Sequence, residues 1–565
     1  MNCFFAGEEY RRMSGNQTPP VKIRDTIRIK GFVYRAVLPV LLLFLTFCGA
    51  EAPDSNVIVI TLDTTRTDHI DTGDGAKAYT PELKRFAQQA VTFQQAYSTI
   101  PQTLPAHLSM FTSRLPHECG VLGNPDIYDG RFTTLAEVLK KKGYYTAGMV
   151  SLGTLAAKTG ISRGFDLFQD SPDRGETFFL PAETMTNKAI KLIQQLKDRK
   201  FFLFLHYSDP HSPYSPPGVE APFRVFLDGQ LLFSFNAYQG AILRKTIPLE
   251  RGLHTLTFKV ETTSQDFDQF ALRRLKTGKN CTLTFENITF SKDHYNGTHL
   301  MQGTTGAIHI RCKGNDTLTL FQVIPMLTRN GALEMYRKEV EYMDRYIGKF
   351  LRVIEQEGLA QRTAIVIVGD HGEGLGERNK YFGHVRYLNR QFIHVPYMIY
   401  WPGIMPQQVK QPVSLLSVSP TLLEYLGIDN RLHGFRAKES VVTAIKTGTW
   451  PSRPIYSFAF SPSALKNKLS IISWPYQSIF FLESTGVAPR IEFYNLLLCQ
   501  SYRQMDRLAV DVLMRYSMPD FHFFHNAYTR LKNVFAMLPK TIKKDGQSVL
   551  DEDKREKLRS LGYVE

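Results

Sequence analysis

Four residues of this 565-residue chain have the types and settings needed to hold a divalent cation. Asp63 directly follows the apolar run 56–62, and Asp370 and His371 directly follow the apolar run 363–369. The fourth, Thr103, stands two residues before Pro105, which suits the first turn of a helix. Oxygen and imidazole donors together fit Zn or Mn better than Mg, and Ca remains open if the oxygens dominate. The pattern predicts one divalent metal ion.

Thr103 is also a candidate nucleophile, because a metal or a base can activate a hydroxyl as an alkoxide. At a helix N-terminus, free N–H groups and the positive end of the dipole favour an anion. The alternative is that Thr103 only caps the helix. Two further candidates, His211 and His384, lie in polar segments after apolar runs and could contact ester oxygens or move a proton to the leaving group. The competing interpretation is a set of loop residues, each satisfied locally.

The segments around these residues predict an α/β fold. The runs 56–62, 201–206 and 363–369 read as strands of a sheet covered on both faces. Helical patterns at 80–90, 134–142 and 332–357 alternate with them, which predicts a mainly parallel sheet flanked by helices. Such sheets bind ligands at the carboxyl ends of their strands. Asp63, Asp370 and the segment after residue 206 all lie at such ends.

The composition along the chain divides it into five parts. We expect an export leader at 1–53, the first part of a catalytic domain at 54–221, an inserted all-β module at 222–325, the second catalytic part at 326–450, and a smaller C-terminal subdomain at 451–565 with helices at 500–515, 525–536 and 551–561. The insert either binds a glycan or another partner, or serves as a structural lid. Its two cysteines, Cys281 and Cys312, are either paired after export or free thiols.

The N-terminal residues predict export. A basic stretch at 22–35 precedes the apolar run 36–47, which is too short to span a membrane comfortably, and Cys48 follows. Lipidation of Cys48, plain signal cleavage and an uncleaved anchor all fit this pattern. We therefore expect a periplasmic or cell-envelope protein, with membrane anchoring through the N-terminus as one option. The net charge of +15 is spread along the chain without a nucleic-acid motif, so we expect an anionic ester and not nucleic acid as partner.

The order of these motifs resembles the sulfatase family of the alkaline phosphatase superfamily. Matching stretches include 57–66, 79–93, 103–107, 209–217 and 366–373, followed by 415–428 and the closing 559–564. The insert is not covered by the resemblance. The resemblance implies that Asp63, Asp370 and His371 bind the metal, that His211 and His107 bind substrate, and that His384 is a further active-site histidine that contacts substrate.

Three positions depart from the family pattern. Thr103 stands where sulfatases carry the Cys or Ser that becomes formylglycine, and threonine cannot form that aldehyde. His107 replaces an arginine, and Thr64 replaces a second metal aspartate. A threonine nucleophile with an Asp-His pair is similar to phosphonate or phosphodiester hydrolases, phosphoethanolamine transferases and lipoteichoic acid synthases of the same superfamily.

Taken together, the sequence predicts an envelope hydrolase of sulfate or phosphate esters that uses Thr103, with His211 or His384 as acid or base. Its substrate would be a sulfated or phosphorylated glycan, lipid or small molecule. One alternative is an envelope transferase of phosphoethanolamine or phosphoglycerol type. Another is a catalytically inactive family member that binds a surface ligand through the β insert.

Overall fold

The computed structural model describes residues 55–72, 79–170, 179–291, 298–377, 382–460, 467–482 and 490–496. Its central feature is an eight-stranded sheet with the order β23-β2-β22-β18-β1-β6-β4-β5. Strand β22 runs antiparallel to both of its neighbours, whereas the other neighbouring strands pair in parallel. This confirms the predicted mainly parallel sheet. The strands are β1 Asn56–Leu62, β2 Val91–Phe93, β4 Tyr145–Val150, β5 Leu167–Gln169, β6 Phe201–Tyr207, β18 Thr363–Gly369, β22 Tyr397–Tyr400 and β23 Gln407–Val409.

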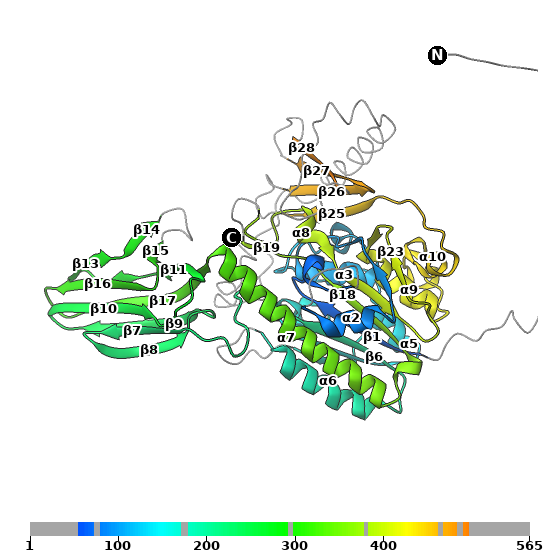
Figure 1. Ribbon diagram of the computed structural model, residues 1–565, viewed down its shortest axis with the longest axis horizontal. Helices are drawn as coiled ribbons and strands as arrows, with labels where there is room; N and C mark the ends of the chain where they lie inside the picture. Colours follow the sequence, from blue (N-terminus) through cyan, green and yellow to red (C-terminus); the bar gives the residue numbers. More distant parts are fainter. Residues whose placement is uncertain are drawn as a thin grey trace, which may run out of the picture. The chain divides into compact units, whose positions relative to one another are not determined.

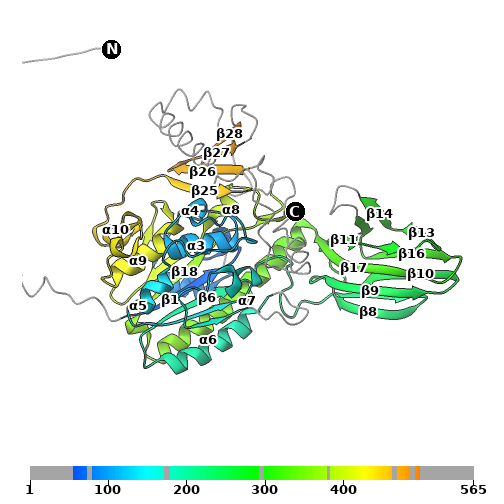
Figure 2. The ribbon, with the colours of Figure 1, turned by 180° about the vertical axis from the view of Figure 1, so that it is seen from behind.

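Helices cover both faces of this sheet because alternate residues of its strands point to opposite sides. Ile58 and Ile60 share one core with α6 and α7, while Val57 and Val59 share the other with α3, α5 and α9. Figure 1 shows α6 and α7 side by side along one face, and Figure 2 shows α3 and α9 from behind. The helices are α2 Pro81–Ala87, α3 Thr103–Thr112, α4 Pro116–Cys119, α5 Leu135–Lys141, α6 Ala182–Leu196, α7 Arg329–Gln356, α8 Arg390–Ile393, α9 Val418–Tyr425 and α10 Val442–Thr447.

The starts of two predicted helices are confirmed, but one is capped in an unexpected way. At α5, the Thr134 hydroxyl accepts the N–H of Glu137, as a capping threonine should. At α2, Thr80 occupies the cap position, yet its hydroxyl accepts the N–H of Asp71 instead. Asp344 of α7, which is buried, caps α2 by accepting the N–H groups of Glu82 and Leu83. A residue distant in sequence therefore satisfies this helix end.

Two segments that read as single strands are divided in the structure. The run 91–97 forms β2 in the main sheet and β3 (Ala96–Tyr97) in a separate sheet with the order β21-β3-β24. The run 395–401 is split at Pro396, which has no N–H to continue a ladder, into β21 (His394–Val395) and β22. The third strand of the small sheet is β24 (Val413–Ser414), and a hairpin near the site pairs β19 (Gly374–Leu375) with β20 (Phe382–Gly383).

The predicted all-β insert consists of two antiparallel sheets. One has the order β13-β16-β10-β7-β8, and the other the order β12-β17-β11-β15-β14 with β9 also paired to β17. Cys281 and Cys312 face each other in the register of β13 and β16 and form a disulfide, which resolves the two options left open above. The strands are β7 Pro222–Leu227, β8 Gln230–Asn236, β9 Ala241–Leu249, β10 Gly252–Val260, β11 Phe267–Arg273, β12 Lys276–Thr277, β13 Cys281–Glu286, β14 Ile288–Ser291, β15 Thr298–Gln302, β16 Thr305–Cys312 and β17 Asp316–Leu327.

A four-stranded antiparallel sheet from the C-terminal part packs against the segment that leads to Thr103. The N–H of Phe458 donates to the carbonyl of Thr99, and Ser457 Oγ donates to the carbonyl of Ser98. Ile100 and Ala106 belong to the same buried cluster as Phe458. This four-stranded sheet therefore fixes the segment 98–100, which leads into α3. Its strands are β25 Ile455–Ala459, β26 Asn467–Ser473, β27 Tyr476–Leu482 and β28 Arg490–Asn495.

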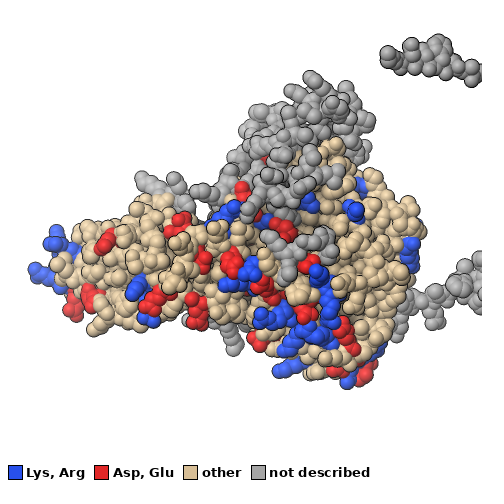
Figure 3. Space-filling view, viewed as in Figure 1, with Lys and Arg blue, Asp and Glu red and all other residues tan. Residues whose placement is uncertain are grey.

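Charged side chains of both signs are interspersed over the face that carries α7 (Figure 3). Several of them pair: Arg337 with Glu334 and Glu341, and Arg352 with Glu82. The excess of positive charge is therefore not gathered into one basic patch on this face.

Several predictions lie outside the described residues, namely the leader at 1–53 with Cys48, the helices at 500–515, 525–536 and 551–561, and the motif at 559–564. Of the helices that the structure describes, none is both long enough and apolar enough to cross a bilayer.

Candidate active site

Two aspartates meet at the carboxyl ends of neighbouring central strands. The register pairs Leu62 with Gly369, so Asp63 and Asp370 come next to each other at one edge of the sheet. Both are fully buried. Asp370 Oδ1 accepts two N–H groups, from Thr64 at 3.2 Å and from His371 at 2.7 Å. Within the described chain, Asp370 Oδ2 and both oxygens of Asp63 accept no hydrogen bond. Buried carboxylate oxygens without donors need a cation.

His371 turns one nitrogen toward these oxygens. Its Nδ1–H donates to the carbonyl of Gly372 at 3.0 Å, which leaves a lone pair on Nε2. That Nε2 lies 3.6 Å from Asp63 Oδ1, 3.5 Å from Asp370 Oδ2 and 3.3 Å from Thr103 Oγ1. The structure thus brings together all four residues predicted to bind the metal. Oxygen and imidazole donors on a buried edge fit a divalent cation.

Thr103 is the first residue of α3, as the proline two positions later predicted. Its side chain is fully buried and faces the cluster. The loop after Asp63 is bent by a left-handed conformation at Thr64, with φ of 53°. The Thr64 hydroxyl donates to the carbonyl of Asp63. At this position, where the resemblance implied a second metal aspartate, the side chain stabilises the turn.

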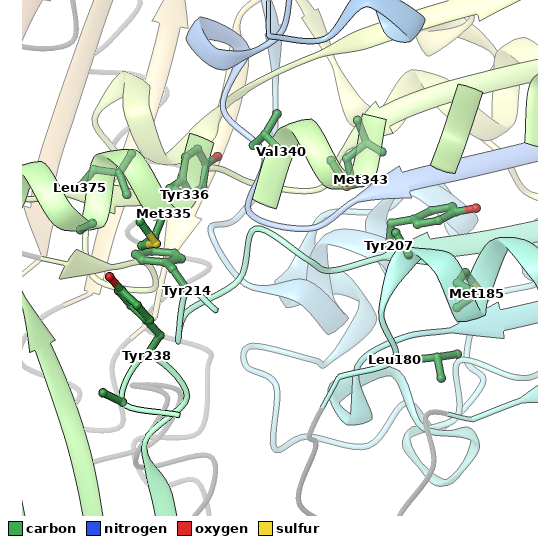
Figure 4. Packing of buried hydrophobic residues seen from close by; sticks show 14 of the residues in the cluster. Leu180, Met185, Tyr207, Tyr214, Tyr238, Met335, Tyr336, Val340, Met343 and Leu375 are labelled. Atoms are coloured by element: carbon green, nitrogen blue, oxygen red, sulfur yellow. The ribbon is translucent and has the colours of Figure 1, made fainter. Parts of the chain in front are cut away.

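A tyrosine of α7 holds that loop. The Tyr336 hydroxyl donates to the carbonyl of Thr64 at 2.8 Å and accepts the N–H of Arg66 at 3.0 Å. Figure 4 shows Tyr336 beside Met335 and Tyr214, which comes from the loop of His211. The Tyr214 and Tyr336 rings meet edge to face, with centroids 5.7 Å apart. Helix α7 therefore positions two of the loops that form the site.

His211, His384 and His371 form a row of contacting rings. The centroids of His211 and His384 are 5.2 Å apart, and those of His384 and His371 are 4.5 Å apart. Nδ1 of His211 donates to the carbonyl of Ser212 at 2.6 Å, and Nδ1 of His384 donates to Glu373 Oε2 at 3.2 Å. The structure thus brings both predicted histidines to the cluster. Burial lowers the pKa of His384 to about 3 and that of His211 well below its ordinary value, so both rings are neutral near pH 7.

His107 is also at the cluster, but its ring is committed to the protein. Its Nδ1 donates to the carbonyl of Thr103 at 2.8 Å, and its Nε2 pairs with Thr61 Oγ1 at 2.9 Å. The ring is fully buried, and its Nδ1 lies 3.8 Å from Asp370 Oδ2. Both nitrogens are engaged, so the geometry favours a role in supporting the start of α3 over the predicted contact with substrate.

Two residues at the site did not emerge from the sequence as functional. Glu373 belongs to the run that follows β18, but no role could be assigned to it without its contact with His384. His206 ends an apolar run and reads as a core histidine, yet its Nε2 lies 3.3 Å from Asp63 Oδ2. Asp209 accepts the N–H of Ala182 at 2.8 Å and so caps α6. Burial raises the pKa of Asp209 to about 7.

Burial also dominates the electrostatics of the metal cluster. It raises the pKa of Asp63 and of Asp370 well above the ordinary range, and each of the two is raised further by a nearby carboxyl group. It lowers the pKa of His371 and of His107 well below the ordinary range, and that of His206 to about 3. A bound cation would oppose the shifts of the carboxyl groups, since it favours the charged form.

Residues 55–428 match the model of the sulfatase family, which is more than half of the chain and contains every residue named at the site. The chain belongs to the sulfatase family. Sulfatases bind a divalent metal, in agreement with the donor cluster, and the enzyme class that goes with the family is the sulfuric-ester hydrolases. Of the two ester classes predicted, membership supports the sulfuric esters.

Known sulfatases are similar over most of the chain. The N-acetylglucosamine-6-O-sulfatase of Bacteroides thetaiotaomicron is 22% identical over 428 residues, which cover 70% of this chain and 72% of the relative. The choline-sulfatase of Rhizobium meliloti is 23% identical over 378 residues, which cover 66% of this chain and 68% of the relative. A solved structure of a protein in complex with its substrate D-glucosamine-2-N,6-O-disulfate aligns with a TM-score of 0.54 and 14% identity over 87% of this chain and 100% of the other, which confirms the fold class.

Removal of the metal from this sulfatase is expected to destabilise the fold. A cation that binds only the folded site stabilises it by about 2.7 kcal/mol when present at about 100 times its Kd. Chelation should therefore lower the Tm, and Zn or Mn should restore it, as measured by differential scanning calorimetry.

The Asp370→Asn variant retains the acceptor for Thr64 and His371 but lacks the charge, so its Tm should respond little to chelator. The Asp344→Asn variant, a buried aspartate that caps α2, should respond like the native protein. A full response in the Asp370→Asn variant would contradict the proposed site.

Proposed function

We propose that the protein is a metal-dependent hydrolase of sulfate esters that uses Thr103 as its nucleophile. The observation that carries this proposal is the 3.3 Å distance between Thr103 Oγ1 and His371 Nε2 inside a buried cluster of metal donors. In the structure Gln102 occupies the cap position of α3 and Thr103 is the first helical residue, so Thr103 is not the helix cap.

Asp63, Thr103, Asp370 and His371 would hold the cation. When bound, the ion lowers the pKa of the Thr103 hydroxyl and offsets negative charge that develops on the ester. The nitrogen donor favours Zn or Mn over Ca as the native ion.

The neutral histidines fit the proton movements of this reaction. With Nδ1–H bound to Ser212 or Glu373, each ring of His211 and His384 presents Nε2 as the proton acceptor. Thr103 Oγ attacks sulfur while the bond from sulfur to the leaving oxygen breaks. One imidazole takes the Thr103 proton and passes it to the leaving alkoxide, which departs as an alcohol.

Water completes the cycle. Because threonine cannot form the aldehyde of other sulfatases, the sulfate ester of Thr103 must be cleaved by attack of water on sulfur. An imidazole accepts a proton from that water, and the Thr103 oxygen is protonated as the bond from sulfur to Thr103 breaks. Sulfate is the product. An acceptor alcohol in place of water would give a transfer reaction.

A sulfated glycan is the substrate class that we propose. One relative is named for N-acetylglucosamine 6-O-sulfate, and the aligned crystal structure contains a disulfated glucosamine. The support for this chain is the shared family and fold.

Replacing Thr103 tests the nucleophile. The Thr103→Ala variant should lose turnover of an aryl sulfate on the order of 10⁴-fold or more, because no other oxygen can form the ester. Thr103→Ser retains a hydroxyl and should retain measurable turnover. Intact-protein mass spectrometry after rapid quenching should detect one sulfuryl group on the native protein.

Thr112 provides a matched control in the same helix. Its hydroxyl donates to the carbonyl of Leu108 and lies 3.4 Å from Cys119 Sγ, and neither partner belongs to the site, so Thr112→Ala should be active. Native turnover in the Thr103→Ala variant would refute the nucleophile, and absence of turnover in the native protein with every added metal would favour an inactive family member.

The charge of the site predicts a preference for singly charged esters. Among the described residues that offer metal donors, none carries a permanent positive charge, and the ionised carboxylates of Asp63 and Asp370 would balance one divalent cation. The nearby Arg66 is paired with Asp68 and Glu377. A dianionic phosphate monoester would be buried there without a compensating charge. We expect kcat/KM for an aryl sulfate to exceed that for the matched aryl phosphate by about 10²-fold.

A matched phosphodiester is also a monoanion. It therefore separates the effect of the substrate's charge from the effect of having phosphorus or sulfur at the reacting centre. Faster turnover of the phosphodiester than of the sulfate would retain the charge argument but overturn the sulfate assignment. Equal turnover of the phosphate monoester would overturn the charge argument itself.

We also propose that the enzyme works in the cell envelope, on the basis of the basic and apolar stretches at 22–47. The full chain should be found in the envelope fractions, and deletion of 36–47 should leave it in the cytoplasm. Cell fractionation with immunoblotting tests this expectation. Release from the membrane in a Cys48→Ser variant would show anchoring by lipid, whereas an unchanged distribution would exclude it.

A further inference from the structure

We propose that the amino edge of the central sheet, where its parallel strands begin, docks on a membrane surface that carries anionic phospholipids. The inference rests on the proposed location of the protein in the cell envelope, and it is independent of the nucleophile and of the metal. Three features of this edge point to a bilayer as the partner: an excess of basic side chains, an exposed apolar residue, and the point at which the predicted N-terminal anchor joins the fold.

Basic residues gather at this edge because they precede three of the parallel strands. Lysines at the end of α5 come before β4, a Lys-Asp-Arg-Lys segment joins α6 to β6, and an arginine precedes β18. The register places these strand starts side by side, since Asn56 of β1 lies opposite Thr363 of β18 and Tyr145 of β4 lies opposite Phe201 of β6. The seven basic residues, which we call the basic rim, are Lys140, Lys141, Lys142, Lys197, Arg199, Lys200 and Arg362.

Contacts between these segments hold the basic rim together. The carbonyl of Lys200 accepts the N–H of Tyr145 at 2.9 Å, and Arg362 donates to the carbonyl of Lys197. The Arg199 guanidinium lies over the Tyr145 ring, 4.5 Å from its centroid. The rim is therefore part of the folded edge, from the start of β4 to the start of β18.

Acidic residues offset only part of this charge. In the described segments that lead into β4, β5, β6 and β18, three residues are acidic: Asp166 pairs with Lys140 at 2.6 Å, Glu357 pairs with Lys197 at 3.5 Å, and Asp198 is exposed. Seven basic residues against three acidic ones suit a surface of anionic headgroups. The exposed basic residues outside the two pairs are Lys141, Lys142, Arg199 and Arg362.

An exposed apolar residue lies on the same edge. Strand β22 is antiparallel to its neighbours, so it ends where they begin, and the turn 401–406 leads from its end into β23. Met405 in this turn is 76% exposed, whereas Trp401 at its start is buried. Basic residues together with exposed apolar side chains are the combination by which proteins bind the interfacial region of a bilayer.

The predicted anchor joins the fold at this edge as well. Ser55 directly precedes β1, and its carbonyl accepts the hydroxyl of Tyr144, next to β4, at 3.0 Å. Residues 49–54 separate Ser55 from Cys48, and a chain of that length reaches at most about 25 Å. A single lipid chain gives only marginal, reversible membrane binding, and a basic surface is the kind of second signal that makes such binding stable.

Docking by this edge would determine what the enzyme can reach. The metal donors lie at the carboxyl ends of the same strands, and the seven residues of β1 separate the two edges by about 20 Å. The site would therefore open away from the bilayer. This orientation favours the proposed glycan over a substrate that lies within the membrane.

Vesicle sedimentation with the purified full-length protein tests the basic rim. Lys141→Gln, Lys142→Gln and Arg199→Gln would be combined in one rim variant. Binding would be measured to vesicles of phosphatidylcholine alone and to vesicles of phosphatidylcholine and phosphatidylglycerol in equal parts. Each basic residue near an anionic surface contributes about fivefold in binding, so the rim variant should bind the mixed vesicles on the order of 10²-fold more weakly than the native protein. The difference should disappear at about 1 M salt, where the Debye length is about 3 Å.

A matched control removes three exposed basic residues of the insert, which joins the fold at the opposite edge, after the carboxyl end of β6. This insert variant combines Lys259→Gln, Arg311→Gln and Lys313→Gln, has the same net charge as the rim variant, and should bind both kinds of vesicle like the native protein. Met405→Ser should weaken binding to both kinds by about threefold or more, because insertion of an apolar side chain does not depend on lipid charge. A native Tm in each variant shows that binding, and not folding, has changed.

Equal weakening in the rim variant and the insert variant would overturn the inference, because net charge alone would then explain the binding. Native binding of the rim variant to the mixed vesicles would overturn it too. If that variant also loses binding to dextran sulfate, which the native protein binds, the rim is instead a site for the sulfated glycan. Failure of the envelope location would appear separately, as a native chain found in the cytoplasmic fraction of cells.

Discussion

The structure depends on two carboxylates buried side by side at the ends of β1 and β18. The parallel register of these strands makes the approach of Asp63 and Asp370 unavoidable once the sheet forms. Three of their four oxygens accept no hydrogen bond from the described chain. An uncompensated buried charge costs several kcal/mol, which is a large part of the net stability of a domain. Without a cation, burial raises the pKa of both carboxyl groups and favours their neutral form; a bound cation would favour the charged form, so metal binding and stability would be linked.

Ion pairs and hydrogen bonds around the two aspartates hold the loops after β1 and β18 in place. Arg66, in the loop after Asp63, forms ion pairs with Asp68 and Glu377 and donates to the carbonyl of Glu373. The loops after β1 and β18 are thus tied to each other as well as to α7 through Tyr336. The inserted sheets lead directly into α7. There the carbonyl of Asp266 accepts the N–H of Thr328, and Gly331 lies so close to Asp266 that a β-carbon would be 2.6 Å from its carbonyl oxygen. The insert is therefore in close contact with the start of α7, the helix whose Tyr336 holds the loop after Asp63.

Much of the fold and the metal set could be predicted because they depend on local patterns. Apolar runs that end in Asp or His mark strand ends, and Pro105 marks the start of α3. The cap of α2 could not be predicted, because Asp344 comes from another helix that is distant in sequence. The position of His206 beside Asp63 could not be predicted for a similar reason. A histidine within an apolar strand reads as core, and only the pairing of β6 with β1 shows that it faces Asp63. The role of Glu373 likewise depends on the position of His384, which sequence spacing does not determine.

Two positions at which this chain departs from the pattern that the resemblance implies, Thr103 and His107, are compatible with the proposed mechanism. In the proposed mechanism, the sulfate ester of Thr103 is released by attack of water on sulfur, and such attack needs a base near the reacting atoms. Buried imidazoles with depressed pKa values are neutral near neutral pH and can act as that base, whereas an arginine cannot. The resemblance places an arginine at the position of His107, and a neutral histidine there brings no fixed positive charge beside Asp370. In the proposed mechanism, a bound cation would then be the main counter-charge for the carboxylates and the substrate. The threonine, the neutral histidines and the single ion of that mechanism are compatible with one another.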